Sequence, residues 1–561
     1  MGKQKQTSLL LPVFAARSNH KNEFGIGDVQ SLVDQFPILN ALGFNVLQLL
    51  PINETEPPLP SAQDGNRDSP YSAISAFALD PMHISLDPKW LPEAAGLEFP
   101  KAFEHNQASD INYTSVKIEK LKALKHAFSR FAPQPDYYAF INENREWLEK
   151  YSVYRVLVDE YKTADWQSWD QKHQSFATAK DNLKSPEDMN FYVYLQYTSA
   201  KQWKEVGKQA KKNGLTLMGD MPFGVSRTSC DAWGYENLVD LSLSIGVPPS
   251  HDYKPNDFVG RWGQNWGLPP FRTDDVGLDV YKKWLSQRVN KLSTVFTALR
   301  LDYISGNFTT FTFPWEPKDN DKYTYMDYEQ VASHTGGRLP GFYPRRDNHE
   351  QSQKVIDNGR SLIKTIVDAS NGIPLYAENI GYVADGVNGS HGALAQYNVG
   401  GCVLPLYERE WDGRFKQGDE MSGKNIAYYG NHDNKTLQQY WNELVAEWTG
   451  PNGDKGWREM QQVLTAMGWD PTIPPYTDYN DEVYKGLMTR LFRCSCDVIS
   501  LPYNDLTLQP QINYPGVYTD ANWVGRLPDS LAKLKDLPEH KQRFAATQAL
   551  AQERTGLTFE R

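Results

Sequence analysis

Short apolar runs, each ending in polar or charged residues, recur along this chain and constrain its fold more than any other feature. They are FNVLQLLPI at 44–52, LTLMGDMPF at 215–223, ALRLDYIS at 298–305, IPLYAENIG at 373–381, NIAYYGNHD at 425–433 and DVISLPYND at 497–505. Runs that are apolar on both faces are typical of strands buried inside a parallel sheet. The sequence therefore predicts a parallel sheet with polar side chains at the ends of its strands.

Helical patterns lie between these runs. Residues 281–298 and 361–369 have the 3.6-residue periodicity of amphipathic helices, and the polar-faced stretch 199–213 precedes a strand. Alternating strands and helices predict a parallel α/β fold, and a (β/α)8 TIM barrel suits a long chain with carboxylates at its strand ends. A doubly wound sheet is the alternative, but no G-x-G-x-x-G or G-x-x-x-x-G-K-[ST] motif opens a helix after a strand.

The length of 561 residues exceeds what one core usually supports, so the barrel should carry large, mainly helical insertions. Charged and aromatic residues at helical spacing fill 87–190, and loop signals such as TGPNGDKG and DPTIPPY occur within 435–481. We predict the following division: 1–86, first part of the barrel; 87–190, helical insertion; 191–434, central part of the barrel; 435–490, insertion; 491–561, final barrel strand and C-terminal helix.

Composition and charge exclude several classes of protein. No apolar run approaches the roughly 20 residues that a membrane-spanning helix needs. We therefore expect no membrane partner. The net charge of −11 repels polyanions, so we also expect no nucleic-acid partner. The four cysteines have no C-x-x-C spacing and are interpreted as reduced thiols. The apolar start at 9–16 is short and contains Pro12, so we expect a cytoplasmic protein rather than a secreted one.

Four acids follow the apolar runs, namely Asp220, Asp302, Glu378 and Asp433. In a parallel barrel they would lie at the carboxyl ends of strands, where active sites of this fold assemble. Any one of them could instead cap a helix or a turn. Together they indicate one acidic pocket, and two carboxyl groups of different protonation are what a glycosidase needs.

Arg300 and Asp302 are two residues apart, so they should share one side of a strand, with the guanidinium keeping Asp302 ionised. Glu378 could be the second carboxyl group, its proton retained by burial or by nearby negative charge. His432 could donate a hydrogen bond to a sugar hydroxyl or could be structural. No H-x-x-x-H or H-E-x-x-H spacing occurs, so we expect neither a metal nor another cofactor in the chemistry.

An ordered set of motifs extends over most of the chain. It comprises GIGD at 25–28, DSPYSAISAFA at 68–78, GDMPFGV at 219–225, GVPP at 246–249, GQNWGLP at 263–269, RLD at 300–302, AENIG at 377–381, HDN at 432–434, and NYPG followed by NW within 513–523. In these motifs and their order the chain resembles the amylomaltases, the 4-alpha-glucanotransferases of glycoside hydrolase family 77. The resemblance implies a (β/α)8 barrel with insertions, whose first strand precedes GIGD.

The resemblance also implies a role for each candidate residue. Asp302 would be the nucleophile that forms a covalent glucosyl-enzyme, Glu378 the acid/base, and Asp433 the stabiliser of the distorted sugar. The residues implied to orient the nucleophile or to bind sugar are Arg300, Tyr71, Asp220, Trp266, His432 and Asn513. Of these, Tyr71 and Trp266 could instead be ordinary core aromatics.

The reaction implied is retaining transfer of α-1,4-glucan segments between maltooligosaccharides, with a glucan donor, a sugar acceptor and carboxyl groups about 5 to 5.5 Å apart. The chain departs from the family pattern at several positions: Tyr303 stands where the family has His, Asn379 and Thr228 stand where it has Asp, and Ser305 departs as well. Two alternatives therefore stay open. One is an α-glucan hydrolase, and the other is a catalytically impaired glycan-binding homologue.

Overall fold

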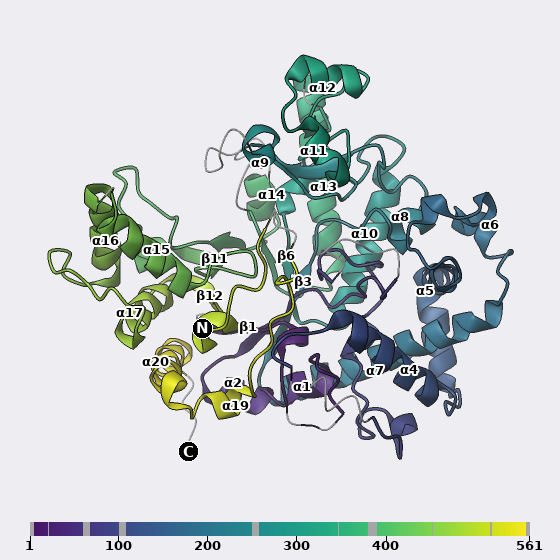
Figure 1. The fold of residues 1–561 in the computed structure, drawn as a ribbon, viewed down its shortest axis with the longest axis horizontal. Helices are drawn as coiled ribbons and strands as arrows, with labels where there is room; N and C mark the ends of the chain where they lie inside the picture. Colours follow the sequence, from purple (N-terminus) through teal and green to yellow (C-terminus); the bar gives the residue numbers. More distant parts are fainter. Residues whose placement is uncertain are drawn as a thin grey trace.

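Eight parallel strands form the centre of the molecule (Figure 1). In spatial order they are β10 (Gly401–Val403), β11 (Ser422–Ala427), β12 (Ser495–Pro502), β1 (Gln6–Leu10), β2 (Val46–Gln48), β3 (Thr216–Met221), β6 (Ala298–Leu301) and β9 (Leu375–Ala377). A parallel bridge between Tyr376 and Gly400 links β9 back to β10, and the N–H of Ala377 donates to the Gly400 carbonyl at 2.7 Å. The predicted (β/α)8 barrel is therefore confirmed.

The protein is described by a computed structural model at residues 5–18, 20, 22–59, 68–99, 108–249, 257–345, 347–379, 390–451, 453–515 and 519–556. Residues 380 and 381 of the AENIG motif and residue 516 of NYPG lie outside the described residues.

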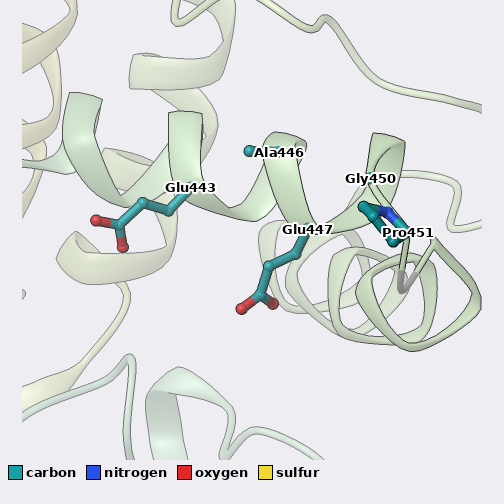
Figure 2. A pocket seen from close by; sticks show the side chains of 5 residues that line it. All are labelled: Glu443, Ala446, Glu447, Gly450 and Pro451. Atoms are coloured by element: carbon teal, nitrogen blue, oxygen red, sulfur yellow. The ribbon is translucent and has the colours of Figure 1, made fainter. Parts of the chain in front are cut away.

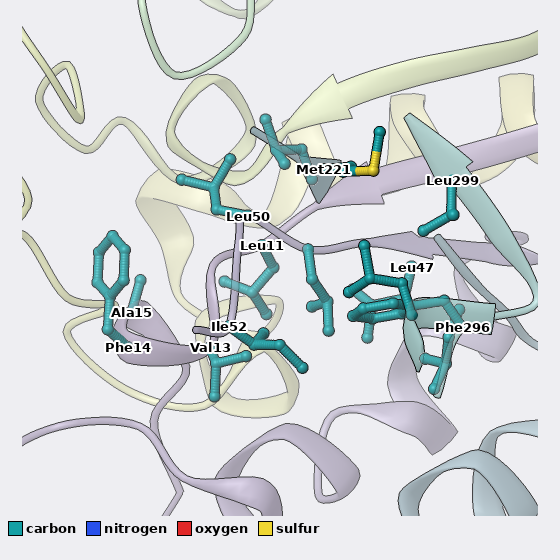
Figure 3. Close-up of a cluster of buried hydrophobic side chains, with 14 of the residues drawn as sticks. Leu11, Val13, Phe14, Ala15, Leu47, Leu50, Ile52, Met221, Phe296 and Leu299 are labelled. Atoms are coloured by element: carbon teal, nitrogen blue, oxygen red, sulfur yellow. The ribbon is translucent and has the colours of Figure 1, made fainter. Parts of the chain in front are cut away.

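Alternate strand residues face two different cores. A small buried cluster takes one residue from each of six strands: Val46, Met218, Ala298, Tyr376, Ile426 and Val498. Their neighbours Leu47 and Leu299 belong to the larger core, part of which Figure 3 shows. Because a strand has a side-chain period of two, Asp220, Arg300 and Glu378 share the face of the small cluster, each two residues beyond one of its members. The candidate residues therefore continue the inner layer of the barrel toward its carboxyl end.

Helices lie in most of the connections between the barrel strands and after the last strand. The first five connections hold α1 (Val29–Val33), α2 (Phe36–Ala41), α4 (Tyr113–Phe128), α5 (Pro135–Tyr161), α6 (Phe176–Ala179), α7 (Met189–Lys212), α8 (Cys230–Gly234), α9 (Phe258–Trp262), α10 (Leu278–Ser293), α11 (Asn320–Tyr323), α12 (Tyr328–His334), α13 (His349–Ala369) and α14 (Ser390–Gln396). The later ones are α15 (Leu437–Thr449), α16 (Gly453–Met467), α17 (Asp481–Phe492), α18 (Tyr503–Thr507), α19 (Leu531–Leu534) and α20 (Pro538–Thr555). In Figure 1, α15, α16 and α17 lie on one side of the barrel and α4 to α7 on the other. Within the described part of the chain, no helix is long and apolar enough to cross a membrane.

A second, antiparallel sheet is a feature that the sequence patterns did not predict. Its strands, in order, are β5 (Gln264–Asn265), β4 (Ser244–Val247), β7 (Thr310–Phe313) and β8 (Gly341–Tyr343). Their side chains help to form a separate aromatic cluster that includes Trp262, Phe313 and Trp315. Strands of two to four residues give too little alternation to be recognised against the surrounding loops.

Element boundaries differ from the predicted ones where tertiary packing decides them. The helix expected over 281–298 ends at Ser293, because Phe296 enters the larger core and Ala298 opens β6. Strand β10 was not predicted, since only three residues beginning with a glycine form it. The segment before GIGD contains β1, as the family resemblance implied, but of the apolar start at 9–16 only Leu9 and Leu10 belong to this strand, and Val13–Ala15 form a 3-10 helix.

Candidate active site

One buried arginine at the carboxyl end of the barrel contacts three carboxylates. Nη1 of Arg300 donates to both carboxylate oxygens of Asp220 at 2.7 Å and to Oδ1 of Asp302 at 3.2 Å. Its Nη2 lies 3.0 Å from Oε2 of Glu378. The arginine side chain is only 4% exposed, so these contacts are largely screened from water. Three of the four predicted acids thus meet at one guanidinium.

Strand register places these groups. Strand β3 pairs with β6 so that Asp220 lies opposite Arg300. Asp302 directly follows β6, and its N–H donates to a carbonyl of β3 at 3.1 Å. Glu378 directly follows β9, and its N–H donates to a carbonyl of β6 at 2.8 Å. The hydrogen-bond ladder therefore extends beyond the strands and holds both carboxyl-bearing backbones in place.

A chain of polar contacts connects the fourth acid to this centre. Tyr71 donates its hydroxyl hydrogen to Asp220 at 2.8 Å, and its oxygen lies 3.2 Å from Nδ1 of His432. Nε2 of the same imidazole lies 3.0 Å from Oδ2 of Asp433. Asn513 donates to the other oxygen of Asp433 at 2.6 Å. The structure thus brings together eight of the nine predicted site residues, and the ninth is Trp266.

Burial and negative charge control the protonation of the acids. Burial raises the pKa of Asp302, and so do the charges of Glu378 and Asp220, although Arg300 acts in the opposite direction. The carboxyl groups of Asp302 and Glu378 are close enough to share a hydrogen bond. This result differs from the expectation that Arg300 keeps Asp302 ionised, because burial outweighs the effect of the guanidinium, which is also shared among three carboxylates. The two carboxyl groups therefore form a pair that retains a proton more strongly than an isolated carboxyl group.

The surroundings of His432 favour the protonated form of its imidazole. Burial alone would lower the pKa of His432, but the charge of Asp433 and the hydrogen bond to it outweigh burial and raise this pKa. Partial desolvation would raise the pKa of Asp433, whose side chain is 45% exposed, but the charge of His432 outweighs this effect and lowers the pKa. A protonated imidazole donates from both nitrogens. His432 can therefore donate to Tyr71 and Asp433 at the same time.

Trp266 lies at the edge of the site and contacts Tyr303 rather than the carboxylates. It follows β5, and its ring meets that of Tyr303 edge-on, with centroids 5.4 Å apart. Phe223 contacts the same tyrosine edge-on, also at 5.4 Å. The backbone of Tyr303 is left-handed, with φ 39°, and its N–H points at Oε2 of Glu378 from 3.4 Å. An aromatic wall thus adjoins the carboxyl pair.

The sequence matches known proteins along most of its length. A profile of glycoside hydrolase family 77, described as 4-alpha-glucanotransferase, matches residues 11–532. The chain belongs to this family. A 4-alpha-glucanotransferase of Chlamydia muridarum is 25% identical over 544 residues, which cover 94% of this chain and 92% of that protein.

Solved structures of family 77 have the same fold. The amylomaltase from Streptococcus agalactiae, determined in complex with acarbose, superposes with a TM-score of 0.72 at 19% identity and covers 98% of this chain and 99% of its own. The amylomaltase from Corynebacterium glutamicum superposes with a TM-score of 0.74 at 17% identity, covering 97% of this chain and 75% of its own. At these identities the comparison shows the barrel architecture.

The departures from the family 77 pattern have identifiable neighbours. Asn379 accepts a hydrogen bond from the N–H of Cys402 at 3.0 Å and so ties the end of β9 to β10. The hydroxyl of Thr228 lies 3.0 Å from that of Ser226, before α8. Tyr303 forms part of the aromatic wall. These three side chains are therefore each held by a specific contact, whereas the buried hydroxyl of Ser305 has no hydrogen-bond partner among the described residues.

Two further residues adjoin the site, although the sequence patterns gave them no role. The N–H of Phe223 points at Oδ2 of Asp302 from 3.4 Å. Trp523 packs on Tyr71 and His432, with ring centroids 5.9 and 5.7 Å away. Both belong to motifs of family 77, GDMPFGV and NW, and this membership was the available signal. Spacing alone could not reveal them, because their partners lie far away in sequence.

No metal site is evident beside these residues. In the ranges that the structure describes, no group of three or more His, Cys, Asp and Glu side chains is arranged to hold a metal ion. A hollow of about 400 Å³ exists elsewhere, beside α15, and is lined by Glu443, Ala446, Glu447, Gly450 and Pro451 (Figure 2). None of the predicted site residues lines it.

Proposed function

We propose that this protein is a 4-alpha-glucanotransferase that transfers α-1,4-glucan segments between maltooligosaccharides by a retaining mechanism. The observation that carries the proposal is the contact of Arg300 with Asp220, Asp302 and Glu378 inside one barrel end. Two carboxyl groups within hydrogen-bonding reach suit a retaining enzyme, because an inverting enzyme keeps them about 6.5 to 9.5 Å apart to admit a water molecule.

In the first step Asp302 attacks the anomeric carbon of the donor as a carboxylate. Glu378 gives its proton to the departing glycosidic oxygen, so that the shortened glucan leaves as an alcohol and a glucosyl ester remains on Asp302. The retained proton of the carboxyl pair is the one this step needs. The mechanism requires Asp302 to be ionised and this proton to be available to the glycosidic oxygen when the donor is bound.

In the second step the acceptor replaces water. Glu378, now ionised, removes a proton from the 4-hydroxyl of a second glucan, whose oxygen attacks the anomeric carbon and releases Asp302. Transfer exceeds hydrolysis when the acceptor occupies the site and water is kept out. The half-buried rings of Tyr303 and Trp266 support this assignment, since sugar rings stack on such faces and displace water.

The remaining residues bind and orient sugar in this proposal. Asp433 and His432 hydrogen-bond to hydroxyl groups of the ring at the cleavage site and stabilise its distorted form. Tyr71 stacks on that ring, held by its hydrogen bonds to Asp220 and His432. Asn513, which donates to Asp433, keeps this carboxylate in position. Arg300 orients Asp302 rather than contacting substrate.

A cytoplasmic location belongs to the same proposal. The cysteines are Cys230, Cys402, Cys494 and Cys496, and all four are free thiols. Burial raises the pKa values of Cys494 and Cys496, so these thiols stay protonated and unreactive. Free thiols are the usual state in a reducing compartment.

Incubation with maltotriose tests the activity. The proposal expects a ladder of longer and shorter glucans, because transfer conserves the number of glycosidic bonds. Glucose and maltose without longer products would indicate a hydrolase, and unchanged maltotriose would indicate a binding homologue. Chromatography of the products, together with a reducing-end assay that should stay constant, separates the three outcomes.

A further inference from the structure

A fully exposed tryptophan stands outside the catalytic centre. Trp411 is 95% exposed, whereas Trp203, Trp284 and Trp441 are among the most deeply buried side chains of the protein. Tyr407, in the same loop, is 69% exposed. Tryptophan is usually well buried because of its large apolar area, so complete exposure contributes nothing to folding and needs another explanation.

The loop presents Trp411 on a rigid turn. Residues 404–417 form a hairpin that directly follows β10, and Arg409 and Phe415 bridge its two arms. At its tip the N–H of Glu410 donates to the Arg414 carbonyl at 2.8 Å, and the N–H of Gly413 donates to the Glu410 carbonyl at 2.9 Å. The φ of 86° at Gly413 allows this tight reversal. Trp411 therefore sits in a defined turn.

Cations anchor the base of the hairpin to the insertion that follows β11. The guanidinium of Arg409 lies 3.9 Å from the centre of the Phe415 ring and pairs with Glu459 of α16. Arg490 of α17 lies 4.6 Å from the same ring and donates to the Pro405 carbonyl at 2.7 Å. The hairpin is thus fixed at its base while its tip stands in solvent.

The hairpin leaves the barrel on the catalytic side. It follows the carboxyl end of β10, and β10 is joined to the end of β9 by the hydrogen bond between Cys402 and Asn379. Glu378 is the residue before Asn379. The hairpin therefore starts at the same end of the barrel as the carboxyl groups.

We propose that Trp411 is a secondary binding platform for α-1,4-glucan chains, outside the catalytic carboxyl groups. An indole face stacks on the apolar face of a glucose ring, and the carboxylates of Glu410 and Asp412 beside it can accept hydrogen bonds from sugar hydroxyls. A second copy of the chain is a poorer occupant, because one indole among charges offers far less than the roughly 800 Å² per partner of a stable interface.

The inference rests on the proposed function for the identity of the glucan, and affinity electrophoresis tests it without turnover. Wild-type protein and Trp411→Ala are run in gels with and without amylose. The platform predicts that amylose retards the wild type and that Trp411→Ala loses at least half of the retardation. Trp411→Tyr should restore part of it. Tyr325→Ala removes an aromatic side chain that is 83% exposed elsewhere and should behave as wild type.

Kinetics provide the second readout. Trp411→Ala should raise KM for amylose about fivefold and leave kcat/KM for maltotriose within twofold, because maltotriose is too short to bridge both sites. Equal loss on both substrates, unchanged retardation, or a change from dimer to monomer on size-exclusion chromatography would each overturn the platform. If the wild type does not disproportionate maltotriose, the proposed function fails, while gel retardation still decides the platform.

Discussion

At the scale of single residues, the site depends on how the guanidinium of Arg300 is shared among three carboxylates. Arg300 lies closest to Asp220, at 2.7 Å from both oxygens, and is 3.2 Å from Asp302. Asp302 therefore receives only part of the charge that would favour its ionisation, and burial dominates its pKa. The nucleophile of the proposed mechanism is thus a carboxyl group held in an environment that opposes its charge.

Replacement of Asp302 by Asn should remove activity. The amide has the shape of the carboxyl group but cannot form the glucosyl ester, so kcat for maltotriose should fall by about a thousandfold or more. Product chromatography against Asp275→Asn, whose side chain is 86% exposed, provides the comparison. Activity above a few per cent of wild type in a pure preparation would show that another group is the nucleophile.

The same substitution should stabilise the protein above neutral pH. The pKa of Asp302 is raised in the folded state above the ordinary aspartate pKa of 3.8. The contribution of this group to stability is therefore fully present below pH 3.8. It is lost as the pH rises through the raised pKa, because the folded protein resists ionisation of this carboxyl group. Asn stays neutral throughout. At pH 8 the melting temperature of Asp302→Asn should therefore exceed that of wild type, by on the order of 1 °C for each kcal/mol gained in the free energy of unfolding. Near pH 4 the two melting temperatures should be equal. A variant that melts lower at pH 8 would indicate that Arg300 needs this charge.

At the scale of elements, the hairpin of β4 and β5 positions Trp266. The two strands approach so closely that a Cβ at Gly246 would lie 1.8 Å from the Gln264 carbonyl oxygen. A Cβ at Gly263 would lie 2.0 Å from the Val247 carbonyl oxygen, and its φ is 100°. The motifs GVPP and GQNWGLP thus contain glycines where backbones meet.

Gly246→Ala should therefore move the hairpin and impair the site. Because β5 must shift away from β4, kcat/KM for maltotriose should fall about tenfold, and overpacking should lower the free energy of unfolding by about 1 to 3 kcal/mol. Trp266→Ala should cause a similar loss of kcat/KM with an unchanged Tm. Gly207→Ala in α7 is the control, since its Cβ would meet only the Val295 carbonyl oxygen, at 3.9 Å. Wild-type kinetics in Gly246→Ala would exclude the hairpin from substrate positioning.

At the scale of the whole molecule, the barrel has one weakly paired seam. Strands β9 and β10 are joined by the bridge of Tyr376 to Gly400 and by the side chain of Asn379, which accepts from the N–H of Cys402. The other neighbouring strands share longer ladders, such as the five paired residues of β1 and β12. The proposed acid/base, Glu378, lies next to this seam.

Asn379 should therefore contribute both to the pairing of β9 with β10, which closes the barrel, and to catalysis. Asn379→Ala leaves the Cys402 N–H without its acceptor, at a cost of about 1 to 2 kcal/mol, so exchange of this amide should accelerate about tenfold. Asn379→Asp keeps an acceptor and should keep the protection. Its negative charge should also strengthen proton retention by the carboxyl pair and move the alkaline limb of kcat/KM to higher pH. Equal exchange in all three proteins would show that the seam does not depend on this side chain.

The sequence by itself predicted the barrel and named eight residues that the structure brings together. Apolar runs marked six of the eight barrel strands, and a period of two placed Arg300 and Asp302 on one side, because both signals arise locally from burial and the pleat. The family motifs added the first strand, and with it the assignment of the apolar start.

Only the tertiary structure decided which groups face one another. Asp220 and Arg300 are 80 residues apart, and they meet because β3 lies beside β6 in register. The stack of Tyr71 on His432 joins groups 361 residues apart, and the pKa of Asp302 follows from burial that no local pattern encodes. Strand β10 and the antiparallel sheet also escaped prediction, because segments of two to four residues take their conformation from neighbouring strands rather than from their own sequence.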